Sequence, residues 1–378
     1  MSQHFELTHG FLPSSSPLKQ LPLAFQAWEN VAANLPKYLL STNFRKTIES
    51  LPPFPEEQLS AAEEERAMLI LSFIGHAYVW GCMPVANTIP ANLAKPWCAV
   101  AERLQRPPIL SYASYALHNW YKIDENGPIA LGNIALLQNF LGGIDEEWFV
   151  LVHIDIEEKA SKALQALVPL QQAVQAHDSK AVLTYLKQLA ISITSICDTL
   201  DRMPEHCDPY MYYNRVRPYI HGWKNNPSLP NGMIYESCYD NKPQSLRGET
   251  GAQSSIIPAL DAVFGIKHKQ DQLREYLLEM RQYMPFEHRA FLNTLENQPD
   301  IRSYVLQQTN DNKDIQQYYN QCIDAIVRFR TTHLKYAALY IQKQHQHESA
   351  NSNSVGTGGT PFMAYLSKHE QETATFKV

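Results

Sequence analysis

Apolar side chains recur at every third or fourth position along most of the chain, the spacing that places them on one face of an α-helix. One continuous stripe follows Asp178 and consists of Val182, Leu186, Leu189, Ile193 and Ile196. A second stripe begins after Asp314, runs to Ile341 and contains His333. Long windows show this helical spacing rather than the alternation of apolar and polar residues that marks a half-buried strand. The pattern predicts an all-α protein.

The longest apolar stretch, residues 67–86, approaches the length of a membrane span. Two glycines, a histidine and a proline interrupt it, which is unusual for a segment that crosses a bilayer. An acidic run at residues 63–65 precedes it, and negative charge is favoured at the start of a helix. We therefore expect a buried core helix over 55–82 and no membrane segment.

Helix start signals appear at three further places. The proline pair at 107–108 predicts a helix that begins near Ile109. Asp145 follows a glycine pair and predicts an N-cap for the next helix. Asp208 before a proline repeats the signal. Together with the two stripes, these signals extend the helical pattern over most of the chain.

Breaks in the pattern suggest how the chain is organised. A glycine pair predicts a boundary between a small N-terminal helical domain, residues 1–141, and a large C-terminal helical domain, residues 142–378. Residues 223–258 are rich in Pro, Asn and Gly and predict a long loop, which inside a compact helical protein is usually functional. The polar run 342–360 predicts a second, mobile loop.

The composition excludes several functional classes. The 378 residues include 32 Lys and Arg against 38 Asp and Glu, a net charge of −6, so no basic field is available to bind nucleic acid or an anionic membrane surface. The first residues lack the basic and apolar regions of a secretion signal. The six cysteines form no CxxC pair, which fits a reducing compartment. We expect a cytoplasmic protein with no nucleic-acid or membrane partner.

Two histidines on apolar faces are candidates for chemistry. His333 follows Arg330 by three positions on one face, and a neutral imidazole is a common axial ligand of haem iron, while a guanidinium pairs with a haem propionate. His153 follows Phe149 by one turn, so two imidazoles on two helices are placed to flank one planar cofactor. A histidine with this spacing is more often a hydrogen-bonded core residue than a ligand. The core interpretation and the haem interpretation both stay open at each position.

Two other segments suggest contacts to a ligand. Tyr213 and Arg217 lie one turn apart, and a guanidinium can bind a ligand carboxylate in a bidentate manner. An ion pair between helices is the ordinary alternative for such an arginine. The glycine-rich run 356–360 lacks the lysine of a P-loop, so it predicts a lid over a small polar ligand rather than a nucleotide site, with a plain linker as the alternative.

Short motifs occur in a fixed order between residues 9 and 366. They are residues 9–13, 77–81, 106–112, 119–120, 222–227, 251–255, 283–289, 330–334 and 356–360. In content and order they resemble the indoleamine 2,3-dioxygenases, haem enzymes of the tryptophan 2,3-dioxygenase superfamily. The resemblance implies an oxidoreductase with haem b, ferrous in its active form, that uses O2 to convert L-tryptophan to N-formylkynurenine in the kynurenine pathway. It also implies an electron donor and a monomer.

The resemblance further implies roles for single residues. His333 is similar to the proximal ligand of the haem iron, Arg330 to the residue that contacts a haem propionate, and Asp261 to the acid that supports this arginine. Arg217 matches the arginine that holds the substrate carboxylate. The other matched positions belong to the indole pocket, the loop at the haem edge and the lid, and they are Tyr112, Phe149, Tyr213, Thr250, Gly251 and Thr357.

Two departures from the family pattern fall in the implied pocket. His153 stands where the animal enzymes have a small serine, and Tyr213 where they have phenylalanine. A distal histidine that accepts a hydrogen bond from the indole N–H is a feature of the related tryptophan 2,3-dioxygenases. We therefore expect His153 to be catalytic. The departures also keep two alternatives open: an enzyme of the superfamily that acts on a different indole, and a non-enzymatic haem protein that binds gas.

Overall fold

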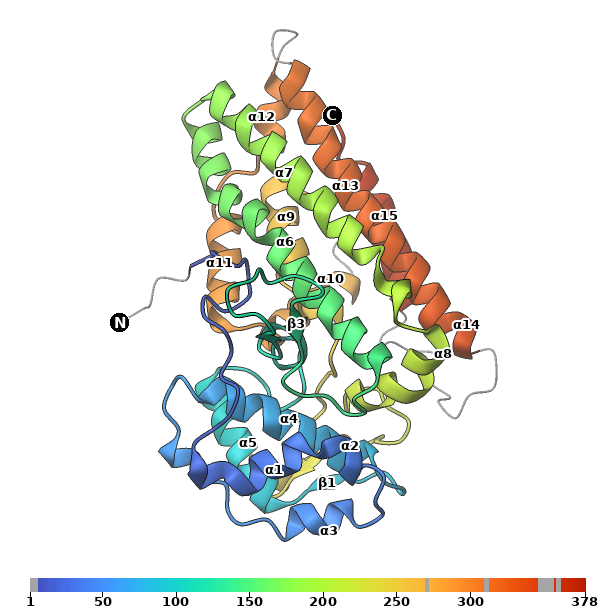
Figure 1. Cartoon of the computed structure of the whole chain (residues 1–378). Helices are drawn as coiled ribbons and strands as arrows, with labels where there is room; N and C mark the ends of the chain where they lie inside the picture. Colours follow the sequence, from blue (N-terminus) through green and yellow to red (C-terminus); the bar gives the residue numbers. More distant parts are fainter. Residues whose placement is uncertain (1–5, 269–271, 309–312, 346–356, 358–361) are drawn as a thin grey trace.

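The computed structural model describes residues 6–268, 272–308, 313–345, 357 and 362–378 (Figure 1). Helices dominate these ranges, which confirms the all-α prediction. Extended structure within them is limited to two short pairs. β1 (Thr88–Ile89) is parallel to β4 (Ile234–Tyr235), and β2 (Tyr121–Lys122) is antiparallel to β3 (Ile134–Ala135). Among the described helices, none combines the length and the apolarity that crossing a bilayer requires.

The N-terminal helices pack around one buried helix, and Figure 1 shows them in blue and cyan at one end of the molecule. They are α1 (Gln26–Ala33), α2 (Leu35–Tyr38), α3 (Phe44–Glu49), α4 (Glu64–Trp80) and α5 (Ala91–Arg103). Almost every side chain of α4 is buried, as predicted for the long apolar stretch. The helix begins later than predicted because the Ser60 N–H donates to Oε2 of Glu63 at 2.8 Å and closes a turn before it.

Four long helices form the other end of the molecule (Figure 1). They are α6 (Ile144–Gln175), α7 (Ser179–Leu200), α13 (Lys313–Ala337) and α15 (Phe362–Ala374). α7 packs against both α6 and α13, and α15 packs against α13. The two predicted stripes lie on α7 and α13, where their apolar residues are buried. Asp178 caps α7 as predicted, since its side chain accepts the Ala181 N–H at 3.0 Å.

Shorter helices complete the fold. They are α8 (Pro209–Met211), α9 (Ile256–Phe264), α10 (Gln272–Met280), α11 (Phe286–Glu296), α12 (Arg302–Gln307) and α14 (Lys343–His345). α9 packs against α6 and α11 and so lies inside the bundle. Turns of π-helix occur at Ala113–Leu117, Tyr212–Val216 and Ala338–Gln342.

The helix predicted to begin near Ile109 is wrong. Residues 109–111 are not helical, and only Tyr112 and the π-turn Ala113–Leu117 follow as helical structure. The Leu110 N–H donates to Nε2 of His76 at 3.0 Å, and the Tyr112 N–H donates to Oε1 of Gln253 at 2.9 Å. Side chains distant in the sequence therefore bind the backbone donors of this segment and hold it as a loop.

The N-cap predicted at Asp145 is displaced. The cap position of α6 is Gly143, and Asp145 lies in the first turn, where its Oδ1 accepts the Asp208 N–H at 2.7 Å. Glu146 binds the preceding loop instead, because its carboxylate accepts backbone N–H groups at residues 140–142. The predicted helix forms, and its start is held by a different acid.

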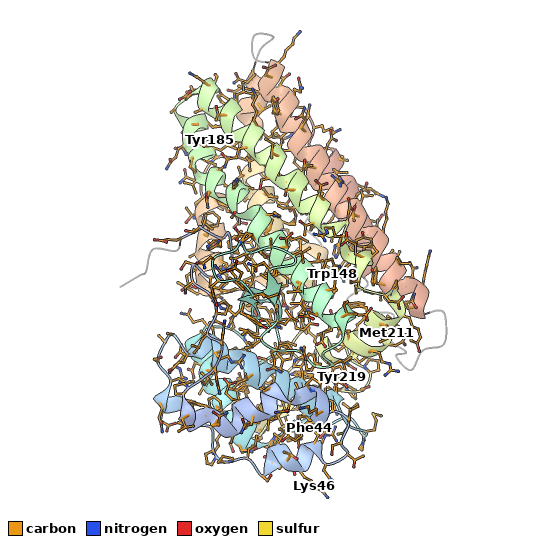
Figure 2. All side chains as sticks on the ribbon, in the orientation of Figure 1. Phe44, Lys46, Trp148, Tyr185, Met211 and Tyr219 are labelled. Atoms are coloured by element: carbon orange, nitrogen blue, oxygen red, sulfur yellow. The ribbon has the colours of Figure 1, made fainter. Side chains whose placement is uncertain are left out.

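The buried apolar residues form two clusters. The first joins the N-terminal helices to parts of residues 220–235 and 276–283, and the second lies among the long helices. α6 contributes to both from opposite faces. Tyr219, labelled in Figure 2, packs against Phe140 of the first cluster at 4.9 Å between ring centroids. The boundary between residues 141 and 142 stays a prediction, and most of the predicted loop 342–360 lies outside the described residues.

Candidate active site

A cavity of about 810 Å³ lies between α6, α9, α13, α15 and the loop that carries residues 249–254. Its volume is in the range of pockets that hold a small-molecule ligand or cofactor. The structure brings most of the residues singled out from the sequence to its walls. These are Tyr112, Phe149, His153, Thr250, Gly251, Asp261, Arg330, His333 and Thr357.

Two of the predicted site residues are not part of this lining. Tyr213 and Arg217 are buried behind the wall, with the guanidinium 5.1 Å from the centre of the Tyr213 ring. Tyr212 lines the cavity instead, and its ring centroid is 4.6 Å from that of Phe149. Both tyrosines belong to the π-turn Tyr212–Val216. The roles that the resemblance implies for Tyr213 and Arg217 stay predictions.

His153 presents a hydrogen-bond acceptor to the cavity. Its Nδ1 lies 2.7 Å from the backbone oxygen of Phe149. Because a carbonyl oxygen only accepts, Nδ1 carries the proton and Nε2 of the neutral ring keeps its lone pair. Burial lowers the pKa of His153 below its usual value, so the ring is neutral at pH 7. The Tyr112 ring stands edge-on to it, with centroids 6.0 Å apart.

His333 projects from α13 into the same cavity, where its side chain has accessible surface. Burial among protein atoms lowers the pKa of His333 to about 4, and the nearby His153 ring contributes to the lowering. Within the described residues, neither ring nitrogen has a hydrogen-bond partner, and the closest ring contact is Phe329 at 6.5 Å between centroids. The imidazole is therefore neutral and able to act as a metal ligand through a nitrogen lone pair.

One turn before His333, Arg330 fixes a positive charge at the cavity wall. Its Nη2 donates to Oδ1 and Oδ2 of Asp261 on α9 at 2.9 and 2.7 Å, and its Nη1 donates to the backbone oxygen of His369 on α15 at 3.2 Å. Burial alone would raise the pKa of Asp261, but the charges of Arg330 and His268 outweigh burial and lower it. The ion pair therefore links three helices beside the candidate ligand.

Two segments distant in the sequence cross beside the cavity with their backbones in contact. A Cβ atom placed on Gly222 would lie 2.0 Å from the Gly248 nitrogen, so only glycine fits. Thr357 joins both segments, since its hydroxyl donates to the Glu249 backbone oxygen at 2.5 Å and its own oxygen accepts the Gly222 N–H at 3.3 Å. The predicted lid residue is thus held over the loop that carries Thr250.

Comparison with known proteins decides the family. The model of the family described as indoleamine 2,3-dioxygenase matches residues 2–376. The chain belongs to the indoleamine 2,3-dioxygenase family. It is 38% identical to indoleamine 2,3-dioxygenase 1 of Rattus norvegicus over 93% of this chain and 89% of the relative. It is 32% identical to indoleamine 2,3-dioxygenase of Saccharomyces cerevisiae over 97% and 90%, and 31% identical to a 6-hydroxytryptophan 2,3-dioxygenase of Fusarium equiseti over 94% and 88%.

The protein is thus an oxidoreductase of the indoleamine 2,3-dioxygenase family, and the family is haem-dependent. The cavity fits such a group on its own features. In the described part of the chain no three metal-ligating side chains converge, so a metal held by several side chains has no site there. Haem iron needs only an axial ligand from the protein, and His333 offers one neutral imidazole without a hydrogen-bond partner in the described structure.

Three residues at this cavity were not expected from the sequence. Tyr212 and Glu249 line it, and the fully buried Glu157 lies next to the lining residue Tyr112. Glu157 accepts hydrogen bonds from the hydroxyls of Tyr112 at 2.9 Å and Ser254 at 2.8 Å, and its position one turn after His153 could have indicated it. Glu249 lines the cavity with its carboxyl group, and no spacing or neighbouring motif in the sequence distinguishes it.

Proposed function

We propose that this enzyme is a haem-dependent dioxygenase that inserts O2 across the indole C2–C3 bond of L-tryptophan and gives N-formylkynurenine. The observation that supports this most strongly is the pair of neutral histidines, His153 from α6 and His333 from α13, at the walls of one cavity. When bound, ferrous haem b supplies the iron at which O2 is activated. The reaction also requires an electron donor that keeps the iron ferrous.

Two residues of the cavity lining would hold the cofactor. His333 would provide an imidazole to the iron, and Arg330 would offer its guanidinium to a haem propionate. Asp261 keeps that guanidinium in place through both carboxylate oxygens. Since α9, α13 and α15 all hold the arginine, its position is set before the cofactor arrives.

Other residues of the same cavity lining would hold the indole. Phe149 and Tyr212, whose rings already pack at 4.6 Å, offer an aromatic surface to the indole ring. Tyr112 is fixed by Glu157 and closes the pocket next to His153. Nε2 of His153 is the acceptor for the indole N–H, since Nδ1 is already used by the Phe149 carbonyl.

The polar end of the substrate would be bound by four further residues. Arg217 takes the carboxylate, which requires the guanidinium to reach past Tyr212 from its place behind the wall. Thr250, Gly251 and Thr357 line the cavity at the loop and lid, and they enclose the amino-acid group. Holding the substrate in one orientation in this way contributes to rate through proximity.

The deciding experiment is turnover by haem-reconstituted, reduced protein with O2 and L-tryptophan, followed by the ultraviolet absorption of N-formylkynurenine. We expect product from the native protein and loss of both the haem band and the product in His333→Ala. His177→Asn is the matched control, because His177 is an exposed histidine at a φ of 52° that asparagine tolerates. An unchanged haem band in His333→Ala would refute its role as the ligand.

A second candidate substrate class follows from the comparison. The relative from Fusarium equiseti carries the name of a 6-hydroxytryptophan 2,3-dioxygenase, so ring-substituted indoles belong in the same assay. Product from 6-hydroxytryptophan but not from L-tryptophan would move the assignment to that substrate. Reversible O2 binding without product from any indole would favour a gas-binding protein.

A further inference from the structure

Glu249 is a buried carboxyl group whose partner the described protein does not supply. Its side chain is 4% exposed and lies at the cavity wall. Its backbone is bound, since the N–H donates to the Ile220 oxygen at 3.2 Å and the oxygen accepts from Thr357. Within the described residues, however, no hydrogen bond or ion pair reaches the carboxyl oxygens. A buried carboxyl without a partner is costly, which points to a partner that comes from outside.

Two other acids near the cavity have partners in the protein. Arg330 is paired with Asp261, and Glu157 accepts two hydroxyl groups. The groups that feel the Glu249 charge are the phenols of Tyr112, Tyr115 and Tyr212, and each has its pKa raised mainly by burial and further by this carboxylate. These phenols are neutral at pH 7 and do not balance a negative charge.

Glu249 and Arg217 both influence the Tyr212 phenol. Apart from burial, the two largest influences on the pKa of the Tyr212 phenol are Glu249, which raises it, and Arg217, which lowers it. The phenol therefore lies within electrostatic reach of Glu249 at the cavity wall. A carboxyl group at that wall is complementary to a ligand that carries an ammonium group.

We infer that Glu249 is the binding site for the ammonium group of the substrate and that it makes the cavity select indoles with a cationic amine. This inference rests on the proposed function in one respect, that the ligand is an indole. It adds a specificity rule: an indole whose side chain ends in an ammonium group binds better than one of equal size without it. Tryptamine, which has the ammonium group but no carboxylate, isolates the Glu249 contribution.

Binding of the ammonium group releases a proton from Glu249. Burial raises the pKa of Glu249 to about 8, so the carboxyl group is largely protonated at pH 7 before a ligand arrives. An ammonium group in contact favours the ionised carboxylate, so the acid proton passes to the buffer while the ammonium keeps its own. The groups that face Glu249 from the packed elements are Tyr112, Tyr115 and Tyr212, and none of them takes up a proton near pH 7.

The test is titration calorimetry of ferric, haem-loaded protein at pH 7 with tryptamine and with indole-3-propionate, in two buffers that differ in ionisation enthalpy. For the native protein we expect tryptamine binding to release nearly one proton. In Glu249→Gln we expect that release to disappear and tryptamine affinity to fall by about 10- to 100-fold, the size of a charge-assisted contact. Affinity for indole-3-propionate is expected to stay within about threefold.

A second variant guards against misfolding. Glu249→Asp keeps the charge on a shorter side chain, and we expect it to restore proton release with part of the affinity. Equal losses for tryptamine and indole-3-propionate in Glu249→Gln, or unchanged tryptamine affinity, would overturn the inference. The proposed function would fail on a different result, the absence of product from native reduced protein. The binding measurements use ferric protein and do not depend on turnover.

Discussion

At the scale of single residues, burial decides the charge of the groups that line the cavity. It lowers the pKa values of His153 and His333 and raises that of Glu249, so all three are largely neutral at pH 7. Arg330 and Asp261 are the exception, because each holds the other in its charged form. The site thus combines a fixed ion pair with neutral donors and acceptors.

The acceptor role of His153 gives a prediction about substrates. Native enzyme is expected to prefer L-tryptophan over 1-methyl-L-tryptophan, because the methyl group removes the N–H that Nε2 accepts; such a loss can reach ~10⁴-fold in kcat/KM. His153→Ser is expected to shrink that ratio by slowing tryptophan more than the methylated analogue. Steady-state kinetics of both substrates measure it. Equal turnover of the two by native enzyme would show that His153 is only a wall of the pocket.

The Arg330–Asp261 pair gives a prediction about stability. Asp261→Asn leaves a buried guanidinium without its counter-charge, and we expect the free energy of unfolding to fall by about 3–5 kcal/mol. The control is Asp198→Asn, which breaks an exposed pair with Arg328 (N–O distance 2.8 Å) and is expected to cost less than about 1 kcal/mol. Urea denaturation measures both. Similar losses in the two variants would contradict the difference that burial makes.

At the scale of elements, the sequence predicts what depends on periodicity. The stripes on α7 and α13 and the cap at Asp178 could all be predicted, because an apolar face and a capping side chain are local features. The helix predicted to begin near Ile109 failed where distant contacts decide. His76 and Gln253 bind the backbone N–H groups of Leu110 and Tyr112 and hold residues 109–111 as a loop.

The candidate site also contains residues that could be predicted from the sequence and one that could not. The family motifs indicated His333, Arg330 and the loop residues, and the one-turn spacing after Phe149 indicated His153; all of these line one cavity. The motifs gave no indication of Glu249, since its importance lies in the absence of a hydrogen-bond partner among the described residues. A missing partner is a property of three-dimensional packing that no spacing along the chain reports.

The contact between α4 and α5 gives a prediction at this scale. A Cβ atom on Gly75 would lie 2.2 Å from the Trp97 ring, so Gly75→Ala is expected to force the helices apart and lower the free energy of unfolding by about 1–3 kcal/mol. Gly143→Ala is the control, because a Cβ atom there would meet no other atom within 4 Å and the φ of Gly143 is −89°. Thermal unfolding compares them, and a stable Gly75→Ala would mean that Trp97 has room to move.

At the scale of the whole molecule, titratable groups with shifted pKa values couple stability to pH. Burial raises the pKa values of Glu146 and Glu157 to about 7 and that of Glu249 to about 8. It lowers those of His76 and His333 to about 3 and about 4. The glutamates make the folded state bind more protons than the unfolded state above pH 4.5, whereas the histidines do the reverse below pH 6.5.

These signs give a prediction about the pH profile. Below pH 6.5 the glutamates and the histidines change the free energy of unfolding in opposite directions. Above pH 6.5 only the glutamates change it, so it is expected to fall as the pH rises from 6.5 to about 8. Glu157→Gln, which keeps an oxygen for Tyr112 and Ser254, should make the fall shallower. The control is Glu57→Gln, at a position outside both apolar clusters, which should leave this fall unchanged. Urea midpoints at the two pH values measure this, and a rise in stability would contradict it.

The crossing at Gly222 and Gly248 restricts how this protein can change by mutation. Because the two backbones occupy adjoining space, a side chain on either glycine would displace both the segment that follows Arg217 and the segment that precedes Glu249. Substrate preference can therefore change through side chains around the crossing, whereas single substitutions of the two glycines themselves are not tolerated. A directed-evolution library would gain most by varying Tyr212, His153 and Glu249 and leaving both glycines untouched.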